Sequence, residues 1–243
     1  MITSVRNFRR KGMETKETTV SYQAEEYLEA IYRLEQKKGS AKTMELARKL
    51  NVVPGSITNT IERLEQRGLV IHEPYKGVKL TEKGQRIASN VIRRHRLAER
   101  MLTDILHLDW SEVHDSACKL EHVLSPEILN PLENALGHPK TCPHGNPIPT
   151  NKGKLVEEES KPLTDLNSGE SGIIVRIADE KPAILKALGS LDLIPKSYVK
   201  VEGKKSFIGP LNILVNGKRY TVEQKLAIHV LVKPTNDQWR NET

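Results

Sequence analysis

Residues 113 to 124, VHDSACKLEHVL, place four side chains of metal-binding type close together: His114, Cys118, Glu121 and His122. On an α-helix an offset of four residues turns by about 40° and an offset of three by about −60°. Cys118, Glu121 and His122 would therefore span roughly 100° of one helix face. Such a group can converge on a single ion.

A second group of possible ligands involves the preceding helical segment. His95 and Glu99 repeat the four-residue spacing, and His114 lies one turn before Cys118. A short connection between helices favours antiparallel packing, which would bring His95, Glu99 and His114 together as a second nest. One such residue alone is more often ordinary core or surface. Six of them at these offsets on two adjacent helices favour metal binding.

The ligand types narrow the class of ion and of reaction. A mixture of carboxylate, imidazole and thiolate suits Fe(II), Co(II), Ni(II) or Zn(II), whereas all-oxygen sites suit Mg, Ca or Mn. A catalytic metal needs an open coordination position and a nearby general acid or base. The chain has no HExxH signature and no other local catalytic motif. We therefore expect a protein that is not an enzyme, and a metal-dependent hydrolase is the weaker alternative.

The elements that must position these ligands begin with three helices. Apolar residues at three-and-four spacing predict a helix over residues 23–38. Thr43 is expected to cap a second helix over residues 43–51. A third helix is expected over residues 56–70 with Gly68 as its stop. Its inward face would consist of Ile57, Ile61 and Leu64.

A hairpin is expected directly after the third helix, because LVIHEPYKGVKLT contains two β-prone runs around Pro74 and Gly77. Two short helices around a turn, followed by a hairpin, are typical of a winged helix-turn-helix. In such a unit the polar start of the second helix meets base edges, and basic groups hold phosphates. Ser and Thr at a helix start can equally be plain caps. The candidates for DNA contact are Lys42, Ser56, Thr58, Asn59, Arg63, Lys76 and Lys79.

The remaining sequence divides into a helical part and a β-rich part. Helices are expected from Thr81 to about Leu106, over 111–124 and over 125–137. A stretch rich in Pro, Gly and charges then suggests a linker and a domain boundary near residue 150. Beyond it, short β-rich runs, including LAIHVLVKP and a turn at NG, predict a small β-barrel or sheet with one helix at PAILKALGSL.

Composition and charge agree with this division. Residues 1–100 hold 21 Lys and Arg against 12 Asp and Glu, and residues 101–160 hold 4 against 10. The basic part suits a polyanion, although a basic stretch taken alone is more often an ordinary solvated surface, and the acidic part is rich in oxygen ligands. No apolar run approaches the ~18 residues that span a bilayer, and the basic N-terminus lacks the apolar core of a secretory signal. Two cysteines fit a reducing compartment, so a cytoplasmic protein is expected, with Met13 a candidate for the true start.

The order of motifs resembles a known family. A winged unit followed by HRLAERMLTDI, VHDSACKLEHVLS and GNPIP is similar to the diphtheria-toxin-repressor family of metal-dependent transcriptional repressors. The likeness covers residues 22–149 and, more loosely, 165–233. It implies a repressor of metal-homeostasis genes whose homodimer, stabilised by Fe(II) or Mn(II), binds a palindromic operator in double-stranded DNA. It implies neither a membrane nor a small-molecule substrate.

The resemblance also implies the fold class, which is α+β. A winged helix-turn-helix would precede a helical metal-binding and dimerisation domain, and an SH3-like (FeoA-like) β-barrel would follow. The expected boundaries are 1–21 for a basic extension, 22–82 for the DNA-binding domain, 83–149 for the metal-binding domain, 150–164 for the linker, 165–234 for the SH3-like domain and 235–243 for a tail.

The family's ligands carry over residue by residue. His95, Glu99 and His114 match its ancillary site, and Cys118, Glu121 and His122 match its regulatory site. The first helix would complete the regulatory site with Glu26, and Glu29 lies one turn later. The iron-responsive branch has a cysteine like Cys118 but a methionine at the position of Glu26, whereas the manganese-responsive branch has carboxylates at both. The chain combines the two patterns, so Fe(II) and Mn(II) stay open, with Co, Ni and Zn as further ions in vitro.

Other features carry less weight. Arg96 and Asn146 resemble a structural anion-binding pair, and Cys142 with His144 permits a second metal interpretation. Glu180 lies near a position from which some members supply an ancillary ligand, and we leave it outside the predicted set. The alternative function is a winged-helix regulator that responds to a small molecule and not to metal.

Overall fold

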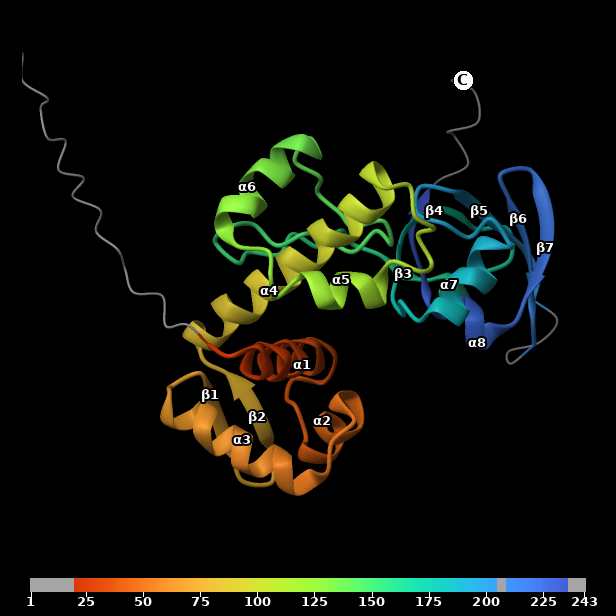
Figure 1. Ribbon diagram of the computed structural model, residues 1–243. Coiled ribbons are helices and arrows are strands. Elements are labelled where there is room, and N and C mark those ends of the chain that lie inside the picture. Colours follow the sequence, from red (N-terminus) through yellow and green to blue (C-terminus); the bar gives the residue numbers. More distant parts are fainter. Residues whose placement is uncertain (1–19, 205–208, 236–243) are drawn as a thin grey trace, which may run out of the picture.

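A computed structural model describes residues 20–204 and 209–235 of the chain. Met13 and most of the expected N-terminal extension and C-terminal tail lie outside these residues. A winged unit, a helical part and a β-rich part follow one another along the chain (Figure 1). The α+β fold class is therefore confirmed. Within the described ranges, no helix is long and apolar enough to cross a membrane.

The winged unit has three helices and a hairpin in the expected order. They are α1 (Tyr22–Lys38), α2 (Thr43–Leu50), α3 (Pro54–Gln66), β1 (Val70–Glu73) and β2 (Gly77–Leu80). The two strands pair antiparallel, which confirms the predicted hairpin. Their position directly after α3 makes the unit winged.

Two helix starts in this unit differ from expectation. Thr43 is the first residue of α2, and the capping position belongs to Lys42, whose side chain makes no capping bond. Helix α3 begins at Pro54 and not at Ser56, because proline fits the first helical turn, where its missing N–H is not needed. Its end is as expected, since Gly68 adopts the left-handed conformation with φ 66°.

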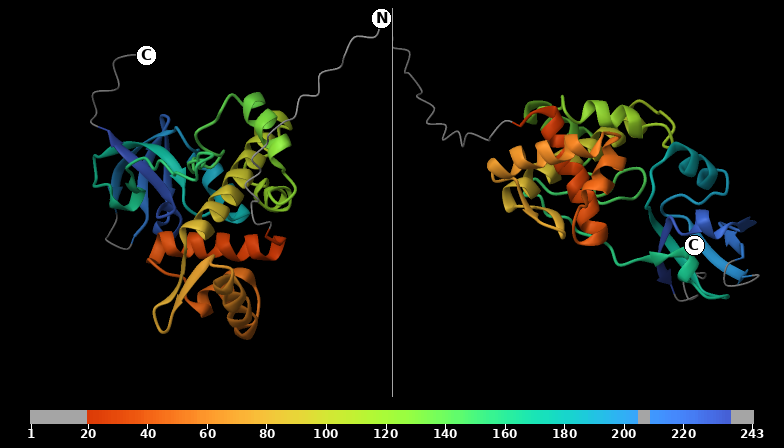
Figure 2. Two further views of the ribbon diagram at one scale, coloured as in Figure 1. Left: turned by 90° about the vertical axis from the view of Figure 1, so that its left-hand side faces the viewer. Right: turned by 90° about the horizontal axis from the view of Figure 1, so that it is seen from below.

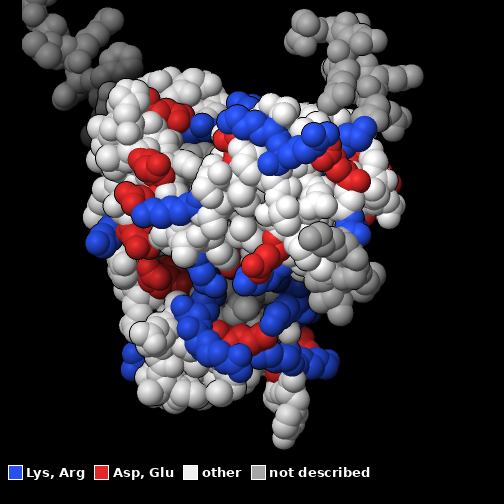
Figure 3. Space-filling model, turned by 90° about the vertical axis from the view of Figure 1, so that its right-hand side faces the viewer, with Lys and Arg blue, Asp and Glu red and all other residues white. Residues whose placement is uncertain are grey.

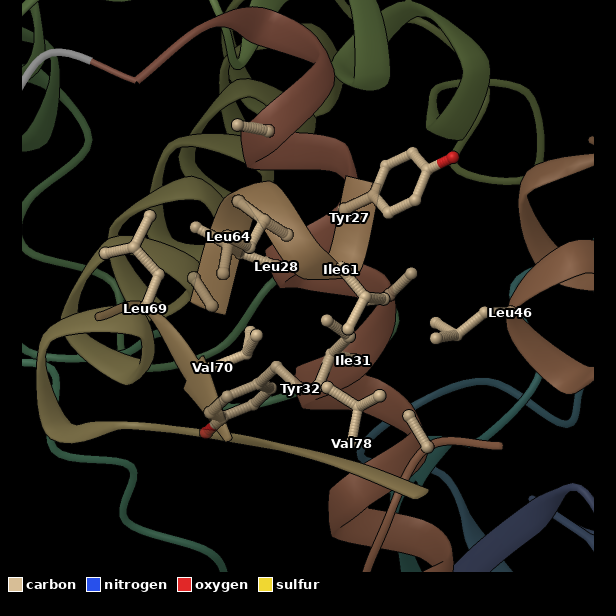
Figure 4. Close-up of a cluster of buried hydrophobic side chains, with 14 of the residues drawn as sticks. Tyr27, Leu28, Ile31, Tyr32, Leu46, Ile61, Leu64, Leu69, Val70 and Val78 are labelled. Carbon is tan, nitrogen blue, oxygen red and sulfur yellow. The ribbon is translucent and has the colours of Figure 1, made fainter. Parts of the chain in front are cut away.

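The core of the winged unit joins α1 to α3 (Figure 4). Ile57, Ile61 and Leu64 on α3 are 1–3% exposed, which confirms the predicted inward face. They belong to one cluster with Leu28 and Ile31 of α1, which are fully buried. Burying an aliphatic side chain contributes roughly 1.5–3 kcal/mol. Helix α1 therefore moves as one body with the helix that is expected to read DNA.

The helical part is built on one long helix. Thr81 caps α4 (Glu82–Arg100) by accepting from the Gly84 amide, and the helix runs on into a π-helical turn at Met101–Ile105. Helices α5 (His114–Leu120) and α6 (Pro126–Ala135) follow. Figure 2 shows α4 leading away from the winged unit, with the C-terminal sheet beside the helical part.

Helix α5 is shorter than the expected 111–124. At its start the Asp109 carboxylate accepts from the Ser111 amide at 2.8 Å, which holds the chain in a turn. At its other end the regular helix stops at Leu120, and residues 121–123 form a turn. The ligand-rich stretch is therefore only partly helical.

The C-terminal part is a six-stranded antiparallel sheet in the order β3-β8-β4-β5-β6-β7. Its helices are α7 (Pro182–Gly189), as expected, α8 (Gln224–Ala227) and the short 3-10 turn Leu163–Asp165. The strands are β3 (Lys161–Pro162), β4 (Ser171–Ile177), β5 (Tyr198–Lys204), β6 (Leu211–Val215), β7 (Lys218–Val222) and β8 (Val230–Thr235).

Two segments here differ from the sequence expectation. Strand β3 lies in the stretch expected to be a linker, and it pairs with β8. The run LAIHVLVKP is a strand only from Val230, because its first residues form the end of α8 and a turn. The turn at Asn216 and Gly217 is confirmed, with φ of 47° and 88°. Such positive values explain the Asn-Gly pair.

Candidate metal centre and DNA interface

The end of α5 meets the first helix of the winged unit at His122. Its Nδ1 lies 2.6 Å from Glu25 Oε2, and its Nε2 lies 3.0 Å from Glu26 Oε1 and 3.0 Å from Glu121 Oε1. The imidazole is only 3% exposed. The ligand atoms of Glu26, Glu121 and His122 all lie within 4.8 Å of one another. We call these three residues the junction nest.

Glu25 is a member of this junction that sequence reasoning missed. Glu25 Oε2 contacts His122 Nδ1. The other oxygen of the same carboxylate accepts a hydrogen bond from the Arg94 guanidinium at 2.6 Å. A carboxylate on one imidazole nitrogen orients the ring and leaves the other nitrogen for an ion. The pair of neighbouring carboxylates, Glu25 and Glu26, was the available signal in the sequence.

Cys118 does not join the junction nest, although the helical offsets suggested that it would. Its sulfur lies 3.9 Å from His95 Nδ1 and 3.9 Å from His114 Nε2, and it forms a ligand group with these two histidines. Cys118 and His114 are four residues apart on α5, so they share one face of that helix, and this face meets His95 of α4. Glu121 links the two groups, since its Oε2 lies 2.6 Å from His95 Nδ1.

Glu29, the second carboxylate expected from the first helix, has another partner. Its Oε1 accepts from Arg33 Nε at 2.7 Å. Burial opposes ionisation of Glu29, but Arg33 outweighs burial and the pKa is lowered. Among the residues that the structure describes, Glu29 is in no ligand group.

The expected second nest does come together, with an addition from the C-terminal domain. His95 Nε2 lies 3.1 Å from Glu99 Oε1, and His114 Nδ1 lies 3.4 Å from the same oxygen. Glu180, between β4 and α7, places its Oε2 3.6 Å from His114 Nδ1. The ligand atoms of these four residues lie within 4.8 Å of one another. We call them the ancillary nest.

The CPH motif lies against the same carboxylates. His144 Nδ1 is 3.3 Å from Glu99 Oε1, 3.7 Å from Glu180 Oε1 and 3.8 Å from the Cys142 sulfur. Cys142 and His144 are fully buried. Together with Glu99 and Glu180 they form another ligand group. The short motif itself was the only sequence signal for this group.

The pKa values reflect how tightly these groups are packed. Burial disfavours the imidazolium of His114, but Cys118 and Glu99 outweigh it and raise its pKa to about 9. Burial and the neighbouring Glu99 disfavour the Glu180 carboxylate, but His144 and Arg33 outweigh them and lower its pKa to about 2. Without metal the ancillary nest is therefore held by contacts between imidazolium and carboxylate groups.

The expected anion-binding pair lines a cavity of about 830 Å³. Arg96 donates to the Pro147 carbonyl, and Asn146 donates to Ile177 O at 3.1 Å and Glu180 Oε1 at 2.7 Å. The cavity lies between the winged unit, the helical part and the C-terminal domain. Figure 3 shows Lys and Arg side chains gathered around a hollow on one face.

Four of the seven DNA-contact candidates lie on α3, two lie in the hairpin, and Lys42 immediately precedes α2. Lys42 is tied to the hairpin, because its ammonium donates to the carbonyls of Tyr75 and Lys76 at 2.8 Å each. It therefore positions the wing. Lys76 pairs with Glu73 at 2.9 Å but is 79% exposed. The other exposed candidates are Ser56, Thr58, Asn59, Arg63 and Lys79.

Three family models match the chain, each to one part of it. The N-terminal DNA-binding domain of iron-dependent repressors matches residues 19–78. The metal-binding and dimerisation domain of the same repressors matches residues 81–150, and a FeoA domain matches 161–234.

Relatives match along most of the chain. It is 33% identical to the iron-dependent repressor IdeR of Mycobacterium tuberculosis over 226 residues, which cover 86% of this chain and 96% of the relative. It is 40% identical to the diphtheria toxin repressor of Corynebacterium diphtheriae over 125 residues, 51% of this chain and 55% of that protein. The first of these relations spans all three parts of the fold.

Solved structures share the whole architecture. A manganese-dependent transcriptional repressor in complex with manganese has a TM-score of 0.80 at 30% identity, covering 87% of this chain and all of that one (100%). IdeR of T. acidophilum has a TM-score of 0.72 at 29% identity, covering 89% of this chain and 99% of that one. These matches confirm the resemblance that the motifs indicated. The chain belongs to the family of iron-dependent repressors.

Proposed function

We propose that the chain represses transcription by binding a palindromic operator in double-stranded DNA as a homodimer, when Fe(II) or Mn(II) occupies its metal sites. The regulatory ligands would be Glu26, Glu121 and His122, and the ancillary ligands His95, Glu99, His114 and Glu180. Cys118, whose sulfur lies 3.9 Å from His95 Nδ1 and 3.9 Å from His114 Nε2, would add a thiolate to the ancillary ligands.

The observation that carries this proposal is the contact of His122 with Glu26 across two domains. Glu26 stands on α1, which shares a core with α3, whereas His122 follows α5. Joint coordination by these side chains would fix the orientation of the DNA-reading unit relative to the helical part. By linkage, metal shifts the population only by its differential affinity for the two arrangements, and a tenfold preference corresponds to about 1.4 kcal/mol.

The ligand chemistry supports Fe(II) or Mn(II) at the junction nest. Two carboxylates and one imidazole are harder ligands than the expected set with a thiolate. Relatives with known structures include a repressor in complex with manganese and ScaR with bound Zn²⁺. Zinc is therefore a sensible comparison ion in vitro.

Exposed apolar side chains on the helical part support the homodimer. Leu108, Val123 and Ile128 are 49%, 67% and 51% exposed. Residues 81–150, which contain them, match a domain that dimerises in the family. Two-fold symmetry would place the two α3 helices in successive major grooves of a palindrome. The homologous repressors act on DNA, so we place the protein in the cytoplasm and propose no catalytic reaction for it.

The test is a DNA-binding titration against the gene's own upstream region, with Fe(II), Mn(II), Zn(II) and chelator in parallel. We expect tight binding with metal and weak, salt-sensitive binding with chelator. Equal binding with chelator would support the small-molecule-responsive alternative. Turnover of a hydrolysable substrate without specific DNA affinity would support the hydrolase.

A further inference from the structure

Two ligand groups, where the helical part meets the C-terminal domain, share the same two carboxylates. One is the ancillary nest, and the other consists of Glu99, Cys142, His144 and Glu180. Each has its ligand atoms within 4.8 Å of one another. Glu99 and Glu180 belong to both, while the remaining ligands differ. The arrangement therefore offers two adjacent positions for an ion.

The two oxygens of Glu180 point to different groups. Its Oε2 lies 3.6 Å from His114 Nδ1, in the ancillary nest, and its Oε1 lies 3.7 Å from His144 Nδ1. Asn146 also donates to Oε1, at 2.7 Å, and fixes the carboxylate. A carboxylate that presents one oxygen to each of two adjacent sites has the geometry of a bridging ligand.

Glu99 lies between the same histidines and is not fully satisfied. Its Oε1 is 3.1 Å from His95, 3.4 Å from His114 and 3.3 Å from His144, so one oxygen serves both groups. Its Oε2 is buried and has no hydrogen-bond partner, although Glu99 is 0% exposed. A buried carboxylate oxygen without a partner costs free energy. A cation bound by both oxygens of Glu99 would supply the missing partner.

His144 is oriented as a ligand would be. Its Nε2 lies 2.7 Å from the Trp110 carbonyl, which leaves Nδ1 facing Glu99, Glu180 and Cys142. A backbone acceptor on one ring nitrogen is the usual support for a metal-binding histidine. The loop itself is held tightly, because the Ile177 amide donates to His144 O at 2.9 Å.

We propose that these residues form a two-ion centre bridged by Glu99 and Glu180. His95 and His114 would complete one site, and Cys142 and His144 the other. The thiolate and imidazole of the second site suit Zn(II), Fe(II) or Co(II) better than Mn(II). For the ion in the ancillary nest this proposal rests on the proposed function. The ion at Cys142 and His144 is the addition.

The centre would also act as a clamp between domains. Glu180 comes from the C-terminal domain, whereas the other five ligands belong to the helical part and its following loop. Loading the second site would therefore favour the docked position of the C-terminal domain. Its ligands do not include Glu26 or His122, so it is separate from the contact with the DNA-reading unit.

The first experiment counts ions. With one ion in the junction nest, the full-length protein should hold three divalent ions per chain after Co(II) or Zn(II) loading and dialysis. Cys142→Ser and His144→Ala should each hold two. His138→Ala, which changes a 63% exposed histidine of the same part, should still hold three. Two ions in the wild type, or three in both CPH variants, would overturn the proposal.

The second experiment identifies the thiolate and the bridge. In Co(II)-loaded Cys118→Ser, a thiolate-to-cobalt charge-transfer band should persist, and it should vanish when Cys142→Ser is added. Bridged cobalt ions are magnetically coupled, so the EPR intensity per cobalt should rise in His144→Ala. Loss of the band in Cys118→Ser alone, or equal EPR intensities, would contradict the two-ion centre.

These results are distinguishable from a failure of the proposed function. Cys142→Ser should lose an ion and still bind the operator in a metal-dependent manner, because its junction nest is intact. If the wild type bound DNA equally with chelator, the proposed function would fail whatever the ion count. Near-equal melting temperatures of metal-free wild type and Cys142→Ser would show that the variant is folded.

Discussion

Replacement of His122 by alanine tests the proposed switch most directly. The imidazole contacts Glu25, Glu26 and Glu121 and is 3% exposed, so it joins α1 to the helical part at a buried point. Loss of a supporting partner of a ligand costs about 10–100-fold in metal affinity. Loss of the ligand itself should therefore cost at least ~100-fold, or about 2.7 kcal/mol.

The loss in metal affinity determines what fraction of junction nests holds a metal ion. At a metal concentration ten times the wild-type Kd, about nine tenths of wild-type junction nests and about one tenth of His122→Ala nests would be filled. The metal-dependent gain in operator affinity should fall in proportion. The metal-free fold should survive, because Glu25 keeps its contact with Arg94 at 2.6 Å. Nonspecific, salt-sensitive DNA binding should be unchanged.

Fluorescence anisotropy of a labelled operator duplex, titrated with protein at fixed Fe(II) or Mn(II), measures this gain. His138→Ala is the matched control, since it removes an imidazole from the same part of the chain outside every nest. If His122→Ala gained as much operator affinity from metal as this control, the junction would not be the switch.

Further predictions concern the dimer, the DNA interface, proton release on metal binding and the core. Val123→Glu, at a 67% exposed position, should shift the protein toward monomer in size-exclusion chromatography with light scattering. Asn59→Ala should weaken operator binding by about 1–3 kcal/mol if Asn59 contacts a base. Lys79→Ala should mainly make the dependence of the log binding constant on log salt concentration less steep, by about 1. The raised pKa of His114, about 9, means that it is protonated at neutral pH without metal. Metal binding should therefore release protons, visible by calorimetry in buffers of different ionisation enthalpy, and affinity should rise with pH up to about 9. In the metal-free protein the same pKa shift stabilises the fold below about pH 6.5, and this contribution is lost as pH rises through about 9. Ile61→Ala should lower the free energy of unfolding by about 2–5 kcal/mol in a urea titration, and an unchanged midpoint would contradict the α1–α3 core.

The sequence by itself determined the elements and the local ligand pairs. Apolar periodicity identified the winged unit, because an amphipathic helix must bury one face, and Ile57, Ile61 and Leu64 do so. The four-residue spacing of His95 and Glu99 identified part of a nest, since these positions share one face of a helix. Both inferences depend only on backbone geometry within one element.

Only the tertiary structure decided which ligands meet. Cys118 lies 3.9 Å from His95 because α5 packs against α4, and the spacing along the chain does not encode that packing. Glu180 reaches the ancillary nest from another domain, and its place depends on how β4 docks against the loop of His144. Distances between side chains of remote segments are set by packing, which spacing along the chain does not encode.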